Sequence, residues 1–289
     1  MVHTHMLTCI TVNYNGADAT IGLLKSLEAQ TGTDFDIIVV DNDSRESDRV
    51  RLAAFASASP LRLDVIYSER NRGFSGGNNL GIRKALAQGS EWIMLINPDT
   101  VVGPTFIHEL RSRLPAEPAL VGLALHEGRR TAYAGIVRWL STTLPHAYRP
   151  DVRTGYAIGA AVLAHRDVFA SAGLLDERYF LYFEDAEYTM RVRGAGLPVM
   201  FLDAPVVMHA VSATTRSLGA PMLLRYHMRN ALLFNRSHGP WWVKGAVPFW
   251  AGLLMLKQGL KMTVPSRRPA AKAIAAGIMD HYRGRYGII

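Results

Sequence analysis

The chain has 289 residues, of which 49% are hydrophobic and 19% charged, so its composition is that of a folded globular protein rather than a disordered one. Its single cysteine, Cys9, excludes an internal disulfide, fits a reducing, cytosolic compartment, and is expected to be buried because it lies in an apolar run. The net charge of +8 is uneven: from Ala213 onward 12 basic residues face one acid, against 20 basic and 23 acidic residues before it, which predicts an acidic partner for the C-terminal quarter.

Apolar, β-branched runs predict four strands, and helical spacing between them predicts helices. The strands are Leu7–Asn13, Phe35–Val40, Arg62–Tyr67 and Glu91–Ile96, and the helices are Asp18–Gln30 and Asn79–Gln88. The stretch SERNRGFSGGNN before the second helix is expected to be a loop, and no strand pattern is evident between Leu125 and Arg153. Because strands that alternate with helices and are apolar on both faces build parallel sheets, the sequence predicts an α/β fold.

A polar cluster follows each of the four predicted strands. The clusters are Asn13–Asn15, Asp41–Asp43, Arg72–Asn79 and Asn97–Asp99. Each one alone is typical of a turn, but the carboxyl ends of parallel strands meet at one edge of a sheet, where ligands bind. The glycines match neither G-x-G-x-x-G after the first strand nor G-x-x-x-x-G-K-[ST], which excludes a nicotinamide dehydrogenase and a phosphate-loop ATPase.

An acidic pair, Glu184 and Asp185, stands directly after the apolar run Phe180–Phe183, at the start of a predicted helix that reaches to about Gly194. Carboxylates in the first turn of a helix are stabilised by about 0.3–1 kcal/mol through the helix dipole. That effect accounts for the acids but not for the four apolar residues before them. Further along this helix, an i,i+4 pair of Glu187 and Arg191 is expected on the surface.

Six motifs, taken in order, resemble those of the inverting family 2 glycosyltransferases, particularly the rhamnosyltransferase-like branch. They are TVNYNG (Thr11–Gly16), VVDNDS (Val39–Ser44), ERNRGFSGGNNLGI (Glu69–Ile82), INPDT (Ile96–Thr100), FLYFEDAEYTMRVRGAG (Phe180–Gly196) and MHAVSATTR (Met208–Arg216). The resemblance implies a GT-A fold, with a Rossmann-like, mostly parallel central sheet flanked by helices. Residues 1–238 would be the catalytic unit, nucleotide-binding to about residue 125 and acceptor-binding from 126, and residues 239–289 would be a helical C-terminal extension.

The same resemblance implies how a nucleoside-diphosphate sugar is bound and used. Donor- or substrate-binding residues would be Thr11, Asn13, Asn15, Asp41, Arg72, Gly73, Asn78, Asn97, Asp99, Glu184 and Arg216. Asp185 would be the general base that takes the proton of the acceptor hydroxyl as that oxygen attacks the anomeric carbon. The run Phe180–Phe183 would pack beneath it and shape the acceptor pocket.

A divalent cation, Mg²⁺ or Mn²⁺, is also implied, because it would neutralise the departing diphosphate. The residues Asn97–Asp99 stand where the family has D-x-D, so only Asp99 offers a carboxylate, and His209 falls at the position of a second ligand. By itself, a histidine that ends an apolar run is more typical of a packed or surface histidine than of a metal ligand. Arg229 would reach the diphosphate or, with Asn230, belong to an ordinary polar helix face.

The resemblance points to dTDP-rhamnose as the donor and to a bacterial surface glycan or its lipid-linked intermediate as the acceptor. A sugar nucleotidyltransferase would need a glycine-rich loop with a basic residue after the first strand, which NYNGADAT lacks. A non-catalytic sugar-binding protein would be favoured by loss of Asp185 or Asp99, and both are present. No nucleic acid is expected as a partner, because the basic C-terminal quarter contains no recognisable nucleic-acid module.

The segment 239–272 combines three tryptophans with apolar runs and basic residues. Its longest uncharged stretch, Gly245–Leu256, has 12 residues, shorter than the roughly 20 that a spanning helix needs. Pro248 argues further against a continuous span. We therefore expect peripheral attachment to the cytoplasmic face of the cell membrane. The alternative is a helical pair that packs on the catalytic domain or on another subunit, which leaves a homodimer open.

Overall fold

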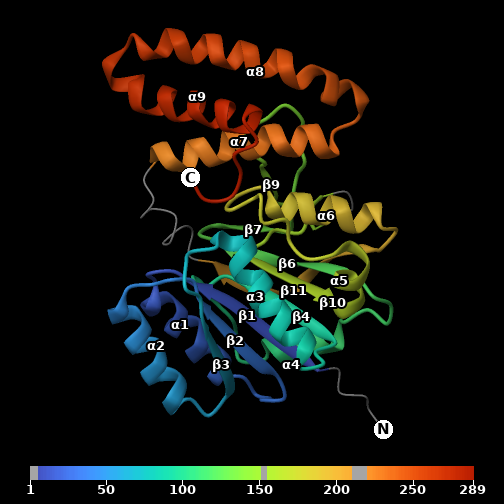
Figure 1. The fold of residues 1–289 in the computed structure, drawn as a ribbon. Coiled ribbons are helices and arrows are strands. Elements are labelled where there is room, and N and C mark those ends of the chain that lie inside the picture. The colour runs from blue at the N-terminus through green and yellow to red at the C-terminus, as the bar shows by residue number, and fades with distance from the viewer. Residues whose placement is uncertain (1–5, 151–154, 210–219) are drawn as a thin grey trace.

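A computed structural model describes residues 6–150, 155–209 and 220–289 and shows a central sheet covered by helices, with a helical layer at one end (Figure 1). In the described part of the chain the sheet has nine strands in the order β3-β2-β1-β4-β10-β6-β11-β5, with β7 paired to β6. They are β1 (Leu7–Asn13), β2 (Asp36–Asp41), β3 (Arg62–Tyr67), β4 (Trp92–Ile96), β5 (Thr100–Val101), β6 (Leu120–Glu127), β7 (Arg130–Ala132), β10 (Ala161–His165) and β11 (Val199–His209). The first four are mutually parallel and β11 is parallel to β6, whereas β10 runs antiparallel between β4 and β6, and β5 and β7 are each antiparallel to their partner. Six of these nine strands thus share one direction, as the mostly parallel prediction requires.

Alternate residues of the central strands face two separate cores. On one face Leu7 and Cys9 of β1 pack under α1 (Ala17–Glu28), α2 (Glu46–Ala58) and α4 (Phe106–Ser112). On the other face Ile10 packs with α3 (Gly73–Ala87), α5 (Arg166–Ala172) and α6 (Glu184–Gly194). Cys9 is 1% exposed, which confirms a core role, and burial raises the pKa of its thiol above the ordinary value.

The glycine-rich stretch is helical, which corrects the loop expected there: α3 begins at Gly73 rather than at Asn79. Gly73 has φ +70°, and a Cβ at this position would collide with the carbonyl oxygen of Phe180. Gly77 similarly lets the helix approach Val12 of β1 closely. The glycines therefore serve close packing at a helix start, which propensity alone cannot reveal.

The stretch without a predicted strand pattern forms short strands. After β7, β8 (Ala134–Gly135) pairs with β9 (His146–Ala147) as a small second sheet. Strands of two or three residues are too short to show the period-2 alternation by which strands are recognised. This small sheet brings His146 to the end of the central sheet, beside Glu127.

Three helices form the layer at the end of the molecule: α7 (Ala220–His238), α8 (Trp241–Met262) and α9 (Arg268–Tyr282), with a 3₁₀ turn between the last two (Figure 1). Their shared core consists of Met228, Leu232, Val247, Ala251 and Ile278. The predicted domain boundary at residue 238 falls between α7 and α8, and this division stays a prediction. Pro248 lies inside α8 and does not interrupt it, contrary to the expectation from its ring and missing N–H.

Helix α7 ties this layer to the residues before the acidic pair. Asn230 donates to the carbonyl oxygens of Leu181 and Tyr182, at 2.8 and 2.9 Å. Arg229 is 1% exposed and donates to the carbonyl of Gly287 at 2.8 Å. Both side chains are buried, so the expectation of a polar surface face for this pair is wrong. The guanidinium of Arg229, which was also expected to reach the diphosphate, donates to backbone carbonyls instead.

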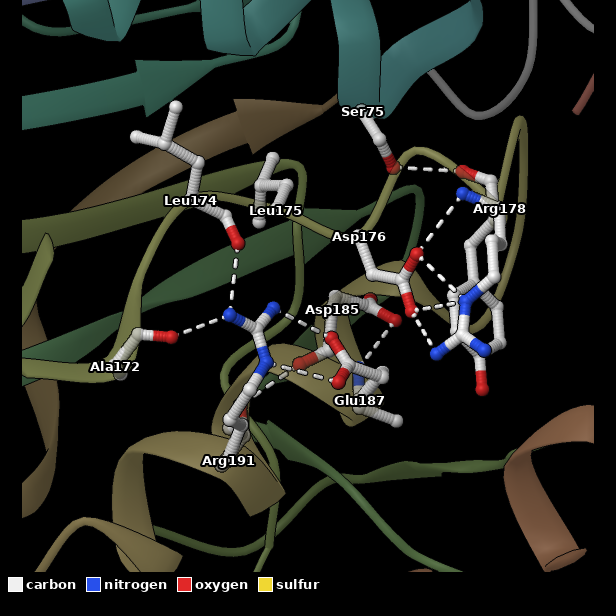
Figure 2. Close-up of polar contacts among 12 residues, drawn as sticks. Ser75, Ala172, Leu174, Leu175, Asp176, Arg178, Asp185, Glu187 and Arg191 are labelled. Carbon is white, nitrogen blue, oxygen red and sulfur yellow. Dashed lines mark hydrogen bonds and ion pairs between the residues drawn. The ribbon is translucent and has the colours of Figure 1, made fainter. Parts of the chain in front are cut away.

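Helix α6 is anchored by an ion pair that the sequence analysis placed on the surface. Arg191 donates to both carboxylate oxygens of Glu187, at 2.9 and 2.8 Å, and to the carbonyls of Ala172 and Leu174 (Figure 2). Glu187 is only 3% exposed, so the surface expectation is wrong. Burial raises the pKa of Glu187, but hydrogen bonds from His238 and Arg191 outweigh it and hold the pKa below its ordinary value.

This pair yields a stability prediction. Arg191→Ala leaves the Glu187 carboxylate buried without its main partner, which costs about 3–5 kcal/mol for a fully buried pair. Because the Arg191 side chain is 28% exposed, we expect a smaller loss of about 2–3 kcal/mol in the free energy of unfolding, measured by urea denaturation. Arg166→Ala, at an exposed position on α5, is the control and should change stability by less than about 0.5 kcal/mol. Equal effects of the two variants would contradict the anchoring role.

Candidate active site

A cleft of about 290 Å³ opens at the carboxyl ends of the parallel strands. It is lined by Val12, Tyr14, Asn42, Asn71, Gly73, Phe74, Asn78, Ile96, Asn97, Pro98, Asp99, Glu127, His146, Ile158, Gly159, Ala160, Phe180, Leu181, Tyr182, Glu184, Asp185 and His209. All four polar clusters that follow the first strands border it or support it. The topology thus brings together residues that lie up to about two hundred positions apart in the chain.

The predicted site residues divide into two groups. Those that line the cleft are Gly73, Asn78, Asn97, Asp99, Glu184, Asp185 and His209. Those that do not line it are Thr11, Asn13, Asn15, Asp41 and Arg72. Arg216 falls in residues 210–219, outside the described residues.

Asn13 and Asp41 form a buried link between the ends of β1 and β2. Asn13 Nδ2 donates to Asp41 Oδ2 at 3.0 Å, and Asp41 Oδ1 also accepts from Arg49 Nε at 2.9 Å. Both side chains are fully buried, so they are engaged with protein rather than exposed to a ligand. Their effect on the cleft is indirect, because they fix the turns that carry Tyr14 and Asn42. Tyr14 and Asn42 were not predicted to line the cleft, although both lie inside the sequence motifs.

Asn42 fastens the end of β2 to the start of α3. Its Nδ2 donates to the carbonyl of Gly73 at 3.0 Å, and its Oδ1 accepts from the N–H of Arg72 at 2.9 Å. The Arg72 side chain is drawn toward Ser68, with Nε 3.3 Å from the hydroxyl oxygen. Hydrogen bonds between the Asn42 side chain and the backbone therefore hold the start of α3 against the end of β2.

A strained turn delivers the acidic pair to the cleft. Tyr182 and Phe183 both have φ +72°, a left-handed conformation that costs a residue with a side chain about 1–3 kcal/mol. Asn230 holds the carbonyl of Tyr182, and the Tyr182 ring stacks on His227 with 3.9 Å between centroids. This turn ends in the first residue of α6, Glu184, so both acids sit in its first turn as predicted.

The two neighbouring carboxyl groups have different surroundings. Asp185 Oδ2 accepts from the N–H of Gly159 at 3.1 Å, and Oδ1 accepts from the N–H of Ala186 at 2.8 Å. Burial raises the pKa of Asp185, and these backbone hydrogen bonds oppose the rise. Burial and the charge of Asp185 raise the pKa of Glu184 well above its ordinary value, and its Oε2 has no hydrogen-bond partner. The pair is therefore arranged to carry its negative charge on Asp185.

A line of acids and histidines runs along the opposite wall. His209 Nε2 is 3.4 Å from Asp99 Oδ1, His209 Nδ1 is 3.2 Å from Glu127 Oε1, and His146 Nδ1 is 3.0 Å from Glu127 Oε2. Burial lowers the pKa of His209, but its bonds to Asp99 and Glu127 outweigh this and raise it to about 9. Burial raises the pKa of Glu127, but its bonds to His146 and His209 bring it to about 2. Glu127 and His146 were missed because no motif or strand pattern marks them.

The charges of the cleft set what it can bind. Four carboxyl groups line it, and the described lining residues include no lysine or arginine. Within the described ranges no three or more His, Cys, Asp or Glu side chains could together hold one ion, so these residues offer no more than a pair of such ligands, of which Asp99 and His209 is the predicted one. That pair fits a hard cation that takes its other ligands from substrate phosphates and water. The bond from His209 Nδ1 to Glu127 fixes the ring as second-sphere carboxylates do in metal sites.

Comparison with known proteins decides the family. The profile of Glycosyl transferase family 2 matches residues 8–169, more than half of the chain. The chain belongs to this family. Family 2 membership makes it a glycosyltransferase that uses a nucleotide-sugar donor.

Characterised family 2 relatives include two rhamnosyltransferases. The dTDP-rhamnosyl transferase RfbF of Shigella flexneri is 23% identical over 218 residues, which cover 71% of this chain and 72% of that protein. The N-acetylglucosaminyl-diphospho-decaprenol L-rhamnosyltransferase of Mycobacterium tuberculosis is 26% identical over 272 residues, covering 83% and 87%. These relatives confirm the rhamnosyltransferase-like branch.

Solved structures support the fold of this family 2 enzyme. S. aureus TarS 1–349 in complex with UDP-GlcNAc has a TM-score of 0.60 at 13% identity, covering 97% of this chain and 93% of that one. The mannosyltransferase PcManGT of Pyrobaculum calidifontis, in complex with GDP-Man and Mn²⁺, has a TM-score of 0.57 at 12% identity, covering 96% and 88%. The predicted GT-A fold is confirmed.

The environment of Glu184 yields a prediction about stability and pH. An acid whose pKa is higher in the folded than in the unfolded protein destabilises the fold once the pH exceeds its unfolded pKa. Glu184→Gln should therefore raise the free energy of unfolding at pH 8, because the amide has no charge to be desolvated. The gain should shrink as the pH falls toward 5.

Denaturant unfolding at both pH values measures this gain, with Glu117→Gln at an exposed position as the control. A gain of the same size at pH 5 and pH 8 would show that the carboxyl charge is not its cause.

Proposed function

We propose that this family 2 glycosyltransferase transfers its sugar with inversion, in one displacement for which Asp185 is the general base. The observation that carries this is the position of the Asp185 carboxylate in the cleft wall, held by the N–H groups of Gly159 and Ala186. The acceptor oxygen attacks the anomeric carbon, the bond from that carbon to the diphosphate oxygen breaks, and Asp185 takes the hydroxyl proton. Burial raises the pKa of Asp185 above that of an ordinary aspartate, which makes its carboxylate a stronger base.

Glu184 would act beside the base rather than as a second one. Its raised pKa favours the protonated form, and Oε2 lacks a partner although it is buried at the cleft. A protonated carboxyl group can donate a hydrogen bond that a carboxylate cannot. We assign Glu184 to binding a substrate hydroxyl in this way.

The nucleotide would lie against the wall formed by Tyr14, Asn42, Gly73 and Asn78. Of the residues expected to bind it, Thr11, Asn13, Asn15, Asp41 and Arg72 would act by holding that wall in place. Asn97 lines the cleft next to the proposed metal ligand, and its N–H donates to the carbonyl of Ala160 at 2.9 Å. Arg216 is assigned to the diphosphate on the family resemblance alone.

A divalent cation, Mg²⁺ or Mn²⁺, would be held by Asp99 and His209 together with the donor diphosphate. The support is electrostatic. A diphosphate brought to four carboxyl groups needs a positive charge nearby, and the described residues that line the cleft include no arginine or lysine to supply it. Bound there, the cation would neutralise the charge that develops on the leaving diphosphate. The Mn²⁺ complex of the mannosyltransferase PcManGT shows a divalent cation in a protein of the same fold.

For the donor and acceptor we propose dTDP-rhamnose and a lipid-linked or polysaccharide intermediate of a bacterial surface glycan. The names of the two rhamnosyltransferase relatives support this, since one uses dTDP-rhamnose and the other acts on a decaprenol-linked sugar. The aromatic turn at Phe180–Phe183 borders the cleft beside Asp185 and would form part of the acceptor pocket.

Asp185→Asn tests the base. The amide keeps the size of the side chain and one acceptor oxygen but cannot take the proton, so transfer should fall about 10²–10⁴-fold. Diphosphate release is measured for both proteins with a panel of dTDP-, UDP- and GDP-sugars, in which dTDP-rhamnose should be the best donor of the wild type. Donor binding, followed by thermal shift, should survive the substitution. Near wild-type turnover by Asp185→Asn would remove Asp185 from the mechanism.

Asp99→Ala tests the metal site. Removing the carboxylate leaves His209 as the one described protein ligand, so the cation should no longer strengthen donor binding. Titration calorimetry of dTDP with and without Mn²⁺ should show tighter binding with the ion for the wild type and for an exposed control, Asp167→Ala, but not for Asp99→Ala. Turnover of the wild type should be lost in excess chelator and restored by Mg²⁺ or Mn²⁺. Full activity in chelator would leave Asp99 as a hydrogen-bond acceptor only.

A further inference from the structure

Helix α8 exposes a continuous apolar stripe. The stripe consists of Trp242, Phe249, Leu253, Leu256 and Leu260, which are 49%, 77%, 68%, 70% and 75% exposed. Their spacing of three, four or seven residues places them on one face of the helix. Trp241, at the first position of α8, is 85% exposed beside the stripe. Soluble monomers seldom expose so many large apolar side chains in one contiguous patch, so the stripe calls for a partner.

The inner face of α8 is packed within this chain. Val243, Val247, Ala251 and Gln258 are at most 2% exposed, and Val247 and Ala251 belong to the core shared with α7 and α9. Figure 1 shows α8 as the helix farthest from the central sheet. The helix therefore packs on the chain with its inner face and presents the stripe outward. Packing on the protein and contact with a membrane, which were given above as alternatives, are thus compatible.

The charges around the stripe identify the partner. From residue 239 to 272 the sequence has six basic residues and no acid: Lys244, Lys257, Lys261, Arg267, Arg268 and Lys272. Lys257 and Lys261 follow Leu253 and Leu256 on the helix, and the next two arginines lie in and after the exposed 3₁₀ turn that ends it. Apolar side chains with tryptophan at one end and bordering lysines are what an interfacial helix presents to anionic lipid.

We propose that α8 lies in the interface of an anionic bilayer, with its stripe among the acyl chains and its basic residues on the lipid headgroups. This deepens the proposed function, because it places the cleft at the surface that would hold a lipid-linked acceptor, on the cytoplasmic leaflet. Among the described residues no helix is both long and apolar enough to cross a bilayer, so the contact would be one of attachment to a surface.

The geometry links the attached helix to the base. Helix α7 packs on α8 through Leu232 and holds the turn before Glu184 through Asn230. Helix α7 therefore connects the proposed membrane-binding helix α8 to the turn that precedes Glu184. Attachment fixes the orientation of the cleft relative to the lipid surface as well as its distance from it.

Liposome flotation of the full chain, without donor or acceptor, tests the attachment. Wild type should float with vesicles of 30% phosphatidylglycerol, less well at high salt, and weakly with phosphatidylcholine alone. The double substitution Leu253→Gln and Leu256→Gln removes two apolar anchors and should lower the partition coefficient at least about tenfold. Lys257→Gln with Lys261→Gln should reduce binding to anionic vesicles and its salt dependence. Val50→Gln, at a valine of α2 that is 56% exposed, is the matched control and should float like the wild type.

Two results would overturn the proposal. One is equal flotation of the wild type and the leucine variant, and the other is a wild type that does not float but forms a dimer that the leucine variant dissociates in analytical ultracentrifugation. The second result would assign the stripe to another copy of the chain. Transfer to a water-soluble acceptor separates this question from catalysis: the leucine variant should retain it, whereas failure of Asp185 as the base would leave flotation unchanged.

Discussion

An anionic donor must enter a cleft that four carboxyl groups already line, and the arrangement of the site follows from that repulsion. Without a bound cation, a protonated His209 between the carboxylates of Asp99 and Glu127 offsets part of the negative charge, and it would give up the Nε2 proton to bind a metal ion. Burial of Glu184 beside Asp185 opposes a second charge on the acidic pair. The charge that remains to be balanced is that of the diphosphate. A divalent cation that binds together with the diphosphate would be the simplest balance.

Asp185, the proposed base, is positioned by contacts that come from outside the sheet. The left-handed residues Tyr182 and Phe183 would relax toward ordinary backbone angles if nothing held them, and Asn230 on α7 supplies two of the restraining hydrogen bonds. On the other side of the turn, the bidentate pair of Arg191 and Glu187 keeps α6 against the preceding loop (Figure 2). The helical layer is consequently part of the catalytic apparatus, although it contributes no side chain to the cleft lining.

Local patterns in the sequence predicted what depends on neighbours along the chain: the four parallel strands, the helix start at Glu184 and the polar clusters at one edge. They failed where the deciding partner is remote. Glu187 and Arg191 show surface spacing, and only the distant loop near Ala172 and His238 reveals that they are covered. Asn13 was predicted to touch the ligand, yet its partner is a carboxylate 28 residues away. Such pairings depend on topology, which hydrophobic periodicity does not encode.

The C-terminal tail ends beside the catalytic segment. Arg229 binds the carbonyl of Gly287, and the N–H of Gly287 donates to the carbonyl of Arg178 at 3.2 Å, just before the aromatic turn. During synthesis the parallel sheet can form long before Gly287 leaves the ribosome, whereas the turn that carries the base lacks this support until then. The segment that leads to Asp185 thus gains its full set of contacts only when the tail is in place. A nascent chain that stalls in α9 would have its nucleotide cleft but would lack the contacts of the tail that support the segment before Asp185.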